Sequence, residues 1–253
     1  MKKKLGILSL IVLIFINSFA YSASATSYTP FDEKGYYDYT GYIGKYKITL
    51  SIYYEESKVV GTYIYDKYRK EINIDGKITG NKIILNEYDV SHNVTGTFQG
   101  VLKEDDTISG VWQDKKGIHK YKFKLKLNDI LTGGEYGHRY DVAGFDQDKD
   151  VAEYVTKFRE YVKNDDASNI SELISYPITV TIDDKFVDIK NKKQFIKNYT
   201  KIFTDDFKNA IINANTNYMF ANWQGVMFGA NLKNVWINYV MDTEGIYITT
   251  INN

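Results

Sequence analysis

Residues 120–127 have the sequence Lys-Tyr-Lys-Phe-Lys-Leu-Lys-Leu, in which lysine alternates with an apolar residue. In an extended chain successive side chains point to opposite faces, so one face of this segment is apolar and the other carries ammonium groups. The same period of two runs through almost all of the segment from Tyr36 to Leu127. The pattern therefore predicts an antiparallel β structure with one buried and one solvated face.

Turn-forming residues interrupt this alternation about every 8–12 residues, a spacing typical of antiparallel strands that follow one another along the chain. They lie at residues 55–57, 66–67, 80–81, 91–93, 105–106 and 116–117. We therefore expect an all-β antiparallel meander or barrel domain over residues 26–127, with seven or eight strands in an up-and-down barrel or strongly curled sheet.

A weak repeat strengthens the barrel prediction. Residues 60–63, 95–98 and 109–112 each have glycine in second place and an aromatic residue in fourth place. Glycine in a strand either lets an aromatic ring lie over bare backbone or allows the bend that a closing barrel needs. In style the segment resembles calycin-like barrels such as lipocalins and avidins. It has none of their specific ligand residues, so the resemblance implies a fold and no site.

From Asp150 the period becomes helical. An apolar stripe predicts the first helix, which Asp148 or Asp150 can cap. The stripe consists of Val151, Tyr154, Val155, Phe158 and Val162. Later patterns predict a short helix near 170–174, a hairpin over 178–189, helices over 195–203 and 205–214, and strands over 218–228, 234–241 and 245–251. The sequence thus predicts an α+β domain over residues 150–253, joined to the β domain by a linker at 128–149.

This order of elements resembles the nuclear transport factor two-like superfamily, whose fold is a cone-shaped α+β domain. The resemblance covers residues 148–253. It is carried by the first helix ending at residues 164–166, the hairpin before Phe195, and the strands around Trp236 and Tyr247. It implies a cone in which the family's enzymes hold an Asp or His base near an oxyanion donor. Many members have no known chemistry, so the fold alone implies no function.

Catalytic and metal-binding candidates are few. His92, His119 and His138 all precede the C-terminal domain, and almost all of its acidic candidates lie in predicted turns or helix starts. The pattern favours a protein that is not an enzyme. The alternative is an enzyme whose base is one of these candidates: Asp183, Asp184, Asp188, Asp205, Asp206, Asp242 or Glu244. Residues 146–150 resemble the start of a calcium loop but lack its later ligands, and there is no cysteine. We expect no metal and no cofactor.

Aromatic residues are the main ligand-binding candidates. In the predicted cone they would face one another, with two amides as polar contacts. The candidates are Tyr154, Phe158, Tyr199, Phe203, Tyr218, Trp223 and Trp236, with Asn222 and Gln224. The other interpretation is that these rings simply form the core. The tyrosine-rich stretch between residues 36 and 68 is similarly open: it suits sugar or protein recognition, or reflects β propensity.

The N-terminus has the layout of a secretory signal peptide. Lysines at residues 2–4 precede an apolar run over residues 5–19, and small residues follow at Ala23 and Ala25. We expect cleavage after Ala25. An uncleaved membrane anchor is the alternative, although the run is short for a span of about 20 residues. No cysteine follows for a lipid anchor, and no second apolar stretch predicts a transmembrane segment.

The whole composition limits the function. The 253 residues carry 32 basic and 32 acidic side chains, which argues against a nucleic-acid partner. The sequence therefore favours a secreted, bacterial, non-catalytic binding protein that recognises a protein, a glycan or a small apolar ligand at or outside the cell surface. Alternatives are an isomerase or hydrolase of the cone type, an inhibitor of a lysozyme-type hydrolase, and a structural envelope protein. An edge strand could also pair two copies into a homodimer.

Overall fold

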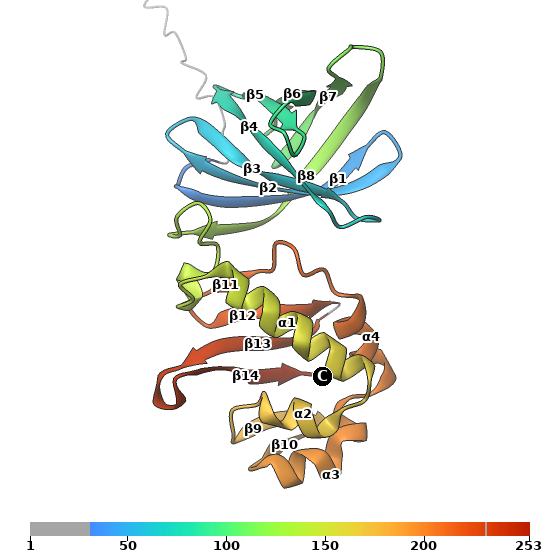
Figure 1. Cartoon of the computed structure of the whole chain (residues 1–253), viewed down its shortest axis with the longest axis vertical. Coiled ribbons are helices and arrows are strands. Elements are labelled where there is room, and N and C mark those ends of the chain that lie inside the picture. The colour runs from blue at the N-terminus through green and yellow to red at the C-terminus, as the bar shows by residue number, and fades with distance from the viewer. Residues whose placement is uncertain (1–30, 231) are drawn as a thin grey trace, which may run out of the picture.

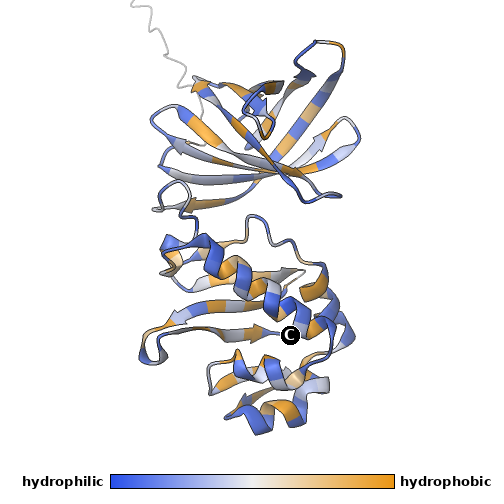
Figure 2. Cartoon of the chain, in the orientation of Figure 1, coloured by the Kyte–Doolittle hydropathy of each residue, from blue (hydrophilic) through white to orange (hydrophobic). Residues whose placement is uncertain are grey.

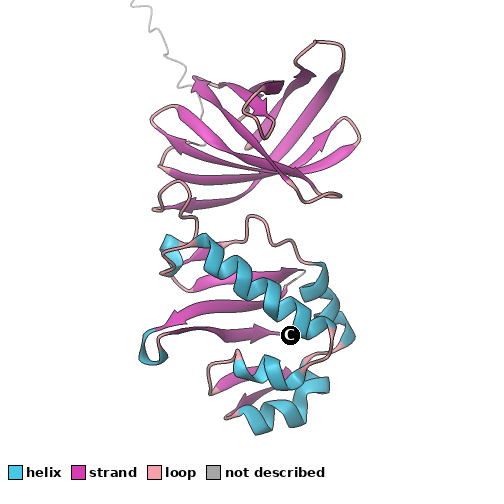
Figure 3. Ribbon diagram, viewed as in Figure 1, coloured by secondary structure: helices cyan, strands magenta, loops and turns pink. Residues whose placement is uncertain are grey.

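The computed structural model describes residues 31–230 and 232–253. Within these ranges the chain forms an antiparallel β-barrel followed by a unit of helices and smaller sheets (Figure 1). The described helices all follow the barrel in the chain (Figure 3). The predicted class, an all-β barrel followed by an α+β part, is confirmed. The predicted signal peptide, residues 1–25, lies outside the described residues.

Eight strands close the barrel, because β1 pairs with both β2 and β8 and every other pair is formed by neighbours along the chain. The strands are β1 (Gly35–Ile43), β2 (Tyr46–Glu55), β3 (Lys58–Tyr65), β4 (Glu71–Thr79), β5 (Lys82–Tyr88), β6 (Val94–Leu102), β7 (Thr107–Asp114) and β8 (Lys120–Thr132). All the predicted turns fall between these strands. The last strand continues past Leu127, so regular structure extends into the predicted linker.

The period of two corresponds to an inward and an outward face, seen as alternating bands of hydropathy along the strands (Figure 2). Phe123 and Leu125 of β8 are buried, while the lysines at 122, 124 and 126 that alternate with them are exposed. Inside the barrel the Phe98 ring meets the edges of Tyr63 and Phe123 at centroid distances of 5.4 and 5.3 Å. At this level side chains fill the barrel, as in other small barrels.

The repeated glycines have one of the two roles that the sequence suggested, room for a ring over bare backbone, and one that it did not suggest, the close approach of two strands. A Cβ atom on Gly96 would lie 2.8 Å from Nε1 of Trp112, so this glycine leaves room for the indole. A Cβ atom on Gly61 would lie 2.1 Å from the carbonyl oxygen of Ser51 on the adjacent strand. Gly96 therefore serves ring packing, and Gly61 serves the close approach of β2 and β3.

A carboxylate is buried among these rings. Glu87 accepts hydrogen bonds from the Tyr63 hydroxyl at 2.6 Å, the Trp112 indole at 2.9 Å and the Thr95 hydroxyl at 2.6 Å. Burial, and then the charge of Glu87, raise the pKa of Tyr63. Neutral donors thus satisfy a charge that would be costly to bury unpartnered.

The α+β unit begins after a loop and contains two sheets. Its helices are η1 (Asp141–Ala143), α1 (Asp148–Lys163), α2 (Ala167–Glu172), α3 (Lys192–Ile202), α4 (Asp205–Asn213) and η2 (Met241–Thr243). Its strands are β9 (Ile178–Ile182), β10 (Lys185–Ile189), β11 (Ala221–Asn222), β12 (Gly225–Ala230), β13 (Lys233–Val240) and β14 (Gly245–Asn252). The first two strands form a hairpin, and the last four form a sheet in chain order.

The apolar stripe of α1 is buried as predicted, and α1 crosses one face of the four-stranded sheet (Figure 1).

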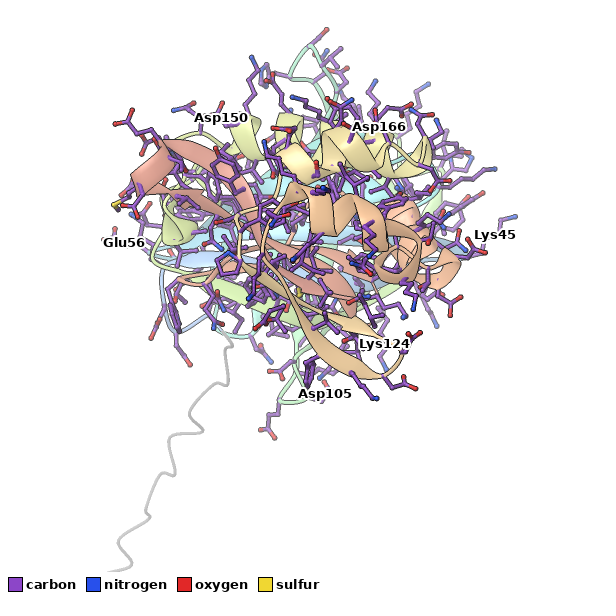
Figure 4. The ribbon with its side chains drawn as sticks, turned by 90° about the horizontal axis from the view of Figure 1, so that it is seen from below. Lys45, Glu56, Asp105, Lys124, Asp150 and Asp166 are labelled. Carbon is purple, nitrogen blue, oxygen red and sulfur yellow. The ribbon has the colours of Figure 1, made fainter. Side chains whose placement is uncertain are left out.

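Charged side chains such as Lys124, Asp150 and Asp166 lie at the rim of the molecule when it is viewed along its long axis (Figure 4). No helix within the described ranges combines the length and the apolar character needed to cross a membrane.

Two sequence predictions for this unit are wrong in detail. Neither Asp148 nor Asp150 caps α1, because the N-cap residue is Gln147 and no side chain caps that end. The predicted strand over 218–228 is interrupted by a turn at residues 223–224, which separates β11 from β12. Alternation of apolar and polar residues continues through this tight turn, so the period alone did not reveal it.

The α+β unit packs on the outer wall of the barrel. Tyr36, Tyr53 and Leu131 point outward from the barrel strands, yet they are buried in the same apolar cluster as Phe158 and Phe228 of the second unit. This shared cluster excludes water from one side of the barrel wall, and it sets the position of a cleft between the two units.

Candidate functional site

A cleft of about 380 Å³ lies between the barrel wall and the α+β unit. Its volume falls within the range of about 300–1,000 Å³ that is usual for small-molecule sites. Hydroxyl, amide and carboxylate side chains contribute much of its lining. They include Tyr36, Thr62, Glu71, Tyr136, Asn217 and Tyr218.

Arg139 lines the floor of the cleft and forms a buried ion pair with Asp38. Arg139 and Asp38 are 6% and 3% exposed, and the guanidinium meets both carboxylate oxygens, with Nη1 at 3.2 Å from Oδ1. Nη1 also donates to the Ser51 hydroxyl at 3.1 Å, and Nε donates to the carbonyl of Met219 at 3.1 Å. Arg139 therefore ties two barrel strands to the segment that leads into β11.

The electrostatics of the floor follow from this pair. Burial alone would lower the pKa of Arg139, but the charge and hydrogen bonds of Asp38 outweigh it and raise that pKa. Asp129, the β8 neighbour of Asp38, is half-buried, and burial followed by the Asp38 charge raises the pKa of its carboxyl group. Because Asp38 neutralises Arg139, the floor offers little net charge to an anionic ligand.

Hydrogen bonds with side chains of α1 and β1 fix the loop that contains Arg139. Asp148, in the first turn of α1, accepts the backbone N–H groups of Arg139 and Tyr140, both at 3.0 Å. The Tyr36 hydroxyl accepts the N–H of Gly137 at 2.7 Å and donates to the carbonyl of Glu135 at 3.3 Å. The carboxylate expected to cap a helix instead fixes one wall of the cleft.

Two tyrosines flank the guanidinium. Arg139 lies 5.2 Å from the centroid of the Tyr36 ring and 5.9 Å from that of Tyr218. The Tyr218 hydroxyl is 2.7 Å from the hydroxyl of Thr62, so this residue reaches from the α+β unit to β3. Burial raises the pKa of both tyrosines. They stay neutral near pH 7 and can donate or accept hydrogen bonds there.

Two carboxylates in the cleft are already engaged. Glu71 accepts from the Asn217 amide at 3.1 Å, and each oxygen of Asp148 accepts a backbone N–H group. In the described part of the chain, no three His, Asp or Glu side chains are grouped in a way that could hold a metal ion. The cleft is therefore best suited to binding through hydroxyl groups, amides and aromatic rings.

The residues predicted to bind a ligand do not converge on one pocket. Only Tyr218 lies in the cleft. Phe158 and Phe203 pack against each other in the core at a centroid distance of 6.3 Å. Tyr154 is 9% exposed and donates to the carbonyl of Leu173 at 2.7 Å. Tyr199 donates to Asp165 at 3.1 Å, and it lines a surface pocket beside α4 together with Phe203, whose ring stacks on it at 5.0 Å.

The remaining candidates lie on the four-stranded sheet. Trp223 is 80% exposed at the turn between β11 and β12, beside the exposed Gln224. Asn222 accepts the backbone N–H of Gln224 at 2.8 Å. Trp236 is partly buried and meets Phe220 edge-on at 6.2 Å. A ligand-binding role for these residues stays a prediction, now without a shared pocket.

Sequence reasoning missed the central residues of the cleft. Asp38 and Arg139 are 101 positions apart, and Ser51 and Arg139 are 88 apart. Neither period nor spacing links such residues. The sequence contained one signal that could have pointed to this site: Asp38 is a polar residue at an outward-facing position within a row of tyrosines.

Comparison with protein-family models finds no match for this chain, and comparison with curated proteins finds no similar sequence. The geometry of the cleft is therefore the basis for assigning a function.

Proposed function

We propose that this protein is a non-catalytic binding protein that works outside the cytoplasm and holds a glycan in the cleft between its barrel and its α+β unit. The observation that carries this proposal is the lining of the cleft, where tyrosine rings and neutral hydroxyl groups surround a floor of paired charges.

A sugar matches this lining better than the other ligand classes considered. A sugar ring has apolar C–H faces and a rim of hydroxyl groups. Tyrosines such as Tyr136 and Tyr218 can cover the faces, while Thr62 and Asn217 can bond the rim with the hydrogen-bonding capacity that their protein partners leave free. A small apolar molecule would leave that capacity unused.

The hydrogen bonds and the exposure of the carboxylates favour binding without catalysis. Asp148 uses both oxygens to hold the loop, and Arg139 uses its donors to hold the two units together. The acids of the enzyme alternative, which include Asp184 and Asp188 of the β9–β10 hairpin, are all exposed, and none of them lines the cleft. They lack the sequestered setting that general acid–base work requires.

The proposal also covers the structural families of the two units and the export of the protein from the cytoplasm. The order of helices, hairpin and closing sheet supports a nuclear transport factor two-like assignment for the α+β unit, and barrel closure supports a calycin-like assignment for the first. The charged, apolar and small-residue segments of residues 2–25 support export. The mass of the protein recovered from its own culture medium tests export, and a mass that still includes residues 1–25 would contradict cleavage.

Titration calorimetry with soluble trimers of β-1,4-linked N-acetylglucosamine, β-1,4-linked glucose and α-1,4-linked glucose tests the glycan proposal. We expect one of these to bind, and Tyr218→Phe to weaken that binding about fivefold by removing one hydroxyl from the cleft. Tyr239→Phe is the matched control, because Tyr239 is 45% exposed and does not line the cleft.

Failure of all three trimers to bind would overturn the proposal. Equal loss in Tyr218→Phe and Tyr239→Phe would place the ligand elsewhere. Inhibition of a lysozyme without any glycan binding would instead favour the hydrolase-inhibitor alternative.

A further inference from the structure

A second cavity adjoins the cleft on the outer wall of the barrel. Its volume is about 780 Å³, and it lies over strands β2 to β5. Tyr136 lines this cavity and also lines the cleft. The two spaces are therefore neighbours separated by one tyrosine.

Tyr136 lies between the cleft and the second cavity, where two other tyrosine rings support it. It lies in the loop after β8, and its ring contacts Tyr36 of the cleft at 6.4 Å and Tyr53 of the second cavity at 5.7 Å. These two supporting tyrosines are buried, whereas Tyr136 is 46% exposed. Burial raises the pKa of Tyr136, so its phenol stays neutral near pH 7. A flat exposed ring on a rigid base is suited to cover the face of a sugar.

The second cavity is also suited to a polar chain. Asn86 is partly buried there and offers an amide, and Lys77 and Asp75 offer charged groups of opposite sign at the exposed edge. Val60 and Ile84 add apolar surface between them. This mixture of amide, charge and short apolar patches offers partners for both the hydroxyl groups and the C–H faces of sugar units.

We infer that the glycan is a linear chain of several sugar units that runs from the cleft over Tyr136 into the cavity on the barrel wall. The inference rests on the proposed function and adds the length of the ligand and a second binding region. The sugar units in the second cavity contribute affinity that a short oligomer cannot obtain.

The test is a length series of the same three backbones, from one to six units, measured by titration calorimetry. Affinity should rise at least tenfold from the trimer to the hexamer of the binding backbone. Hydrogen exchange should show protection of β4 and β5 by the hexamer and little protection there by the trimer.

Asn86→Ala separates the two regions, because Asn86 lines only the second cavity. It should weaken hexamer binding about fivefold and leave trimer binding unchanged. Asn73→Ala is the matched control, since Asn73 is exposed on the neighbouring strand β4 and lines neither cavity.

The outcomes distinguish this inference from the proposed function. If the trimer binds and the hexamer binds no better, the inference is overturned while the proposed function stands. If none of the three trimers binds, the proposed function fails, and this inference fails with it. If Asn86→Ala weakens trimer and hexamer equally, the chain does not extend into the second cavity.

Discussion

Arg139 joins the two units through donors that point in different directions. Its Nη atoms reach Asp38 and Ser51 on the barrel, and its Nε atom reaches the backbone of Met219 on the α+β unit. A lysine could not replace this set of contacts, because an ammonium group lacks the planar fork that meets a carboxylate with two parallel bonds. The identity of this one side chain therefore affects both the interface and the cleft.

Replacing Arg139 by methionine should destabilise the protein by about 3–5 kcal/mol, because Asp38 would then be buried without its partner. Urea unfolding followed by circular dichroism measures the change. Arg159→Met is the control, since Arg159 is only partly buried on α1. The double variant Arg139→Met with Asp38→Leu should recover much of the loss. A single variant as stable as the control would contradict a structural role for the pair.

Asp129 gives a prediction with a defined pH dependence. Burial and the nearby Asp38 raise the pKa of its carboxyl group in the folded state, so the folded protein favours the protonated form. Its stabilising contribution is present below the unfolded pKa of about 3.9 and is lost as the pH rises through the raised value. Asp129→Asn should therefore melt at a higher temperature than the unmodified protein at pH 7, and the advantage should disappear by pH 3.

Asp242→Asn provides the control for that comparison, because it removes one carboxylate from an exposed turn. If both variants shift the melting temperature equally at pH 7, a general charge effect explains the result and the local environment of Asp129 does not.

At the level of strands, local alternation carried most of the information. In the middle of β8 the buried Phe123 and Leu125 alternate with exposed lysines, and this produces a period in the sequence that needs no knowledge of the partner strand. The α1 stripe was equally clear. Turn and cap details were less predictable, because the 223–224 turn keeps the alternating pattern and Asp148 bonds a loop that precedes its helix.

Gly96 allows a test of ring packing within a strand. Gly96→Ala should cost about 1–3 kcal/mol, because the added carbon would displace the Trp112 indole from Glu87. Chemical denaturation measures this loss. The neighbouring Thr97 lies partly exposed on the other face, so Thr97→Val should change stability by no more than about 0.5 kcal/mol. An equally tolerated alanine at Gly96 would show that the ring can move freely.

The two units should unfold together. They share an apolar cluster that includes Tyr36, Tyr53 and Phe158, and the Arg139 bonds cross between them. Calorimetry should therefore record one transition, with equal calorimetric and van't Hoff enthalpies. Arg139→Met should broaden or split this transition. Two separate transitions in the unmodified protein would show that the interface is too weak to couple the units.

The same interface explains why the candidate site could not be predicted. The fold of each unit depends on patterns within about ten residues, whereas the cleft depends on which barrel wall receives the second unit. Tyr218 was selected from the sequence as part of a cone, yet it lies beside Thr62 of the barrel. Only the packing of the two units brings Asp38, Ser51 and Arg139 together.

Closure of the barrel also has a consequence for protein engineering. Gly35 at the start of β1 pairs with Thr132 at the end of β8, so the polypeptide enters and leaves the barrel at adjacent points. The barrel could thus be inserted into a surface loop of another protein through short linkers. A circular permutant that joins these two points and opens the chain at residues 80–81 should keep the same closed sheet.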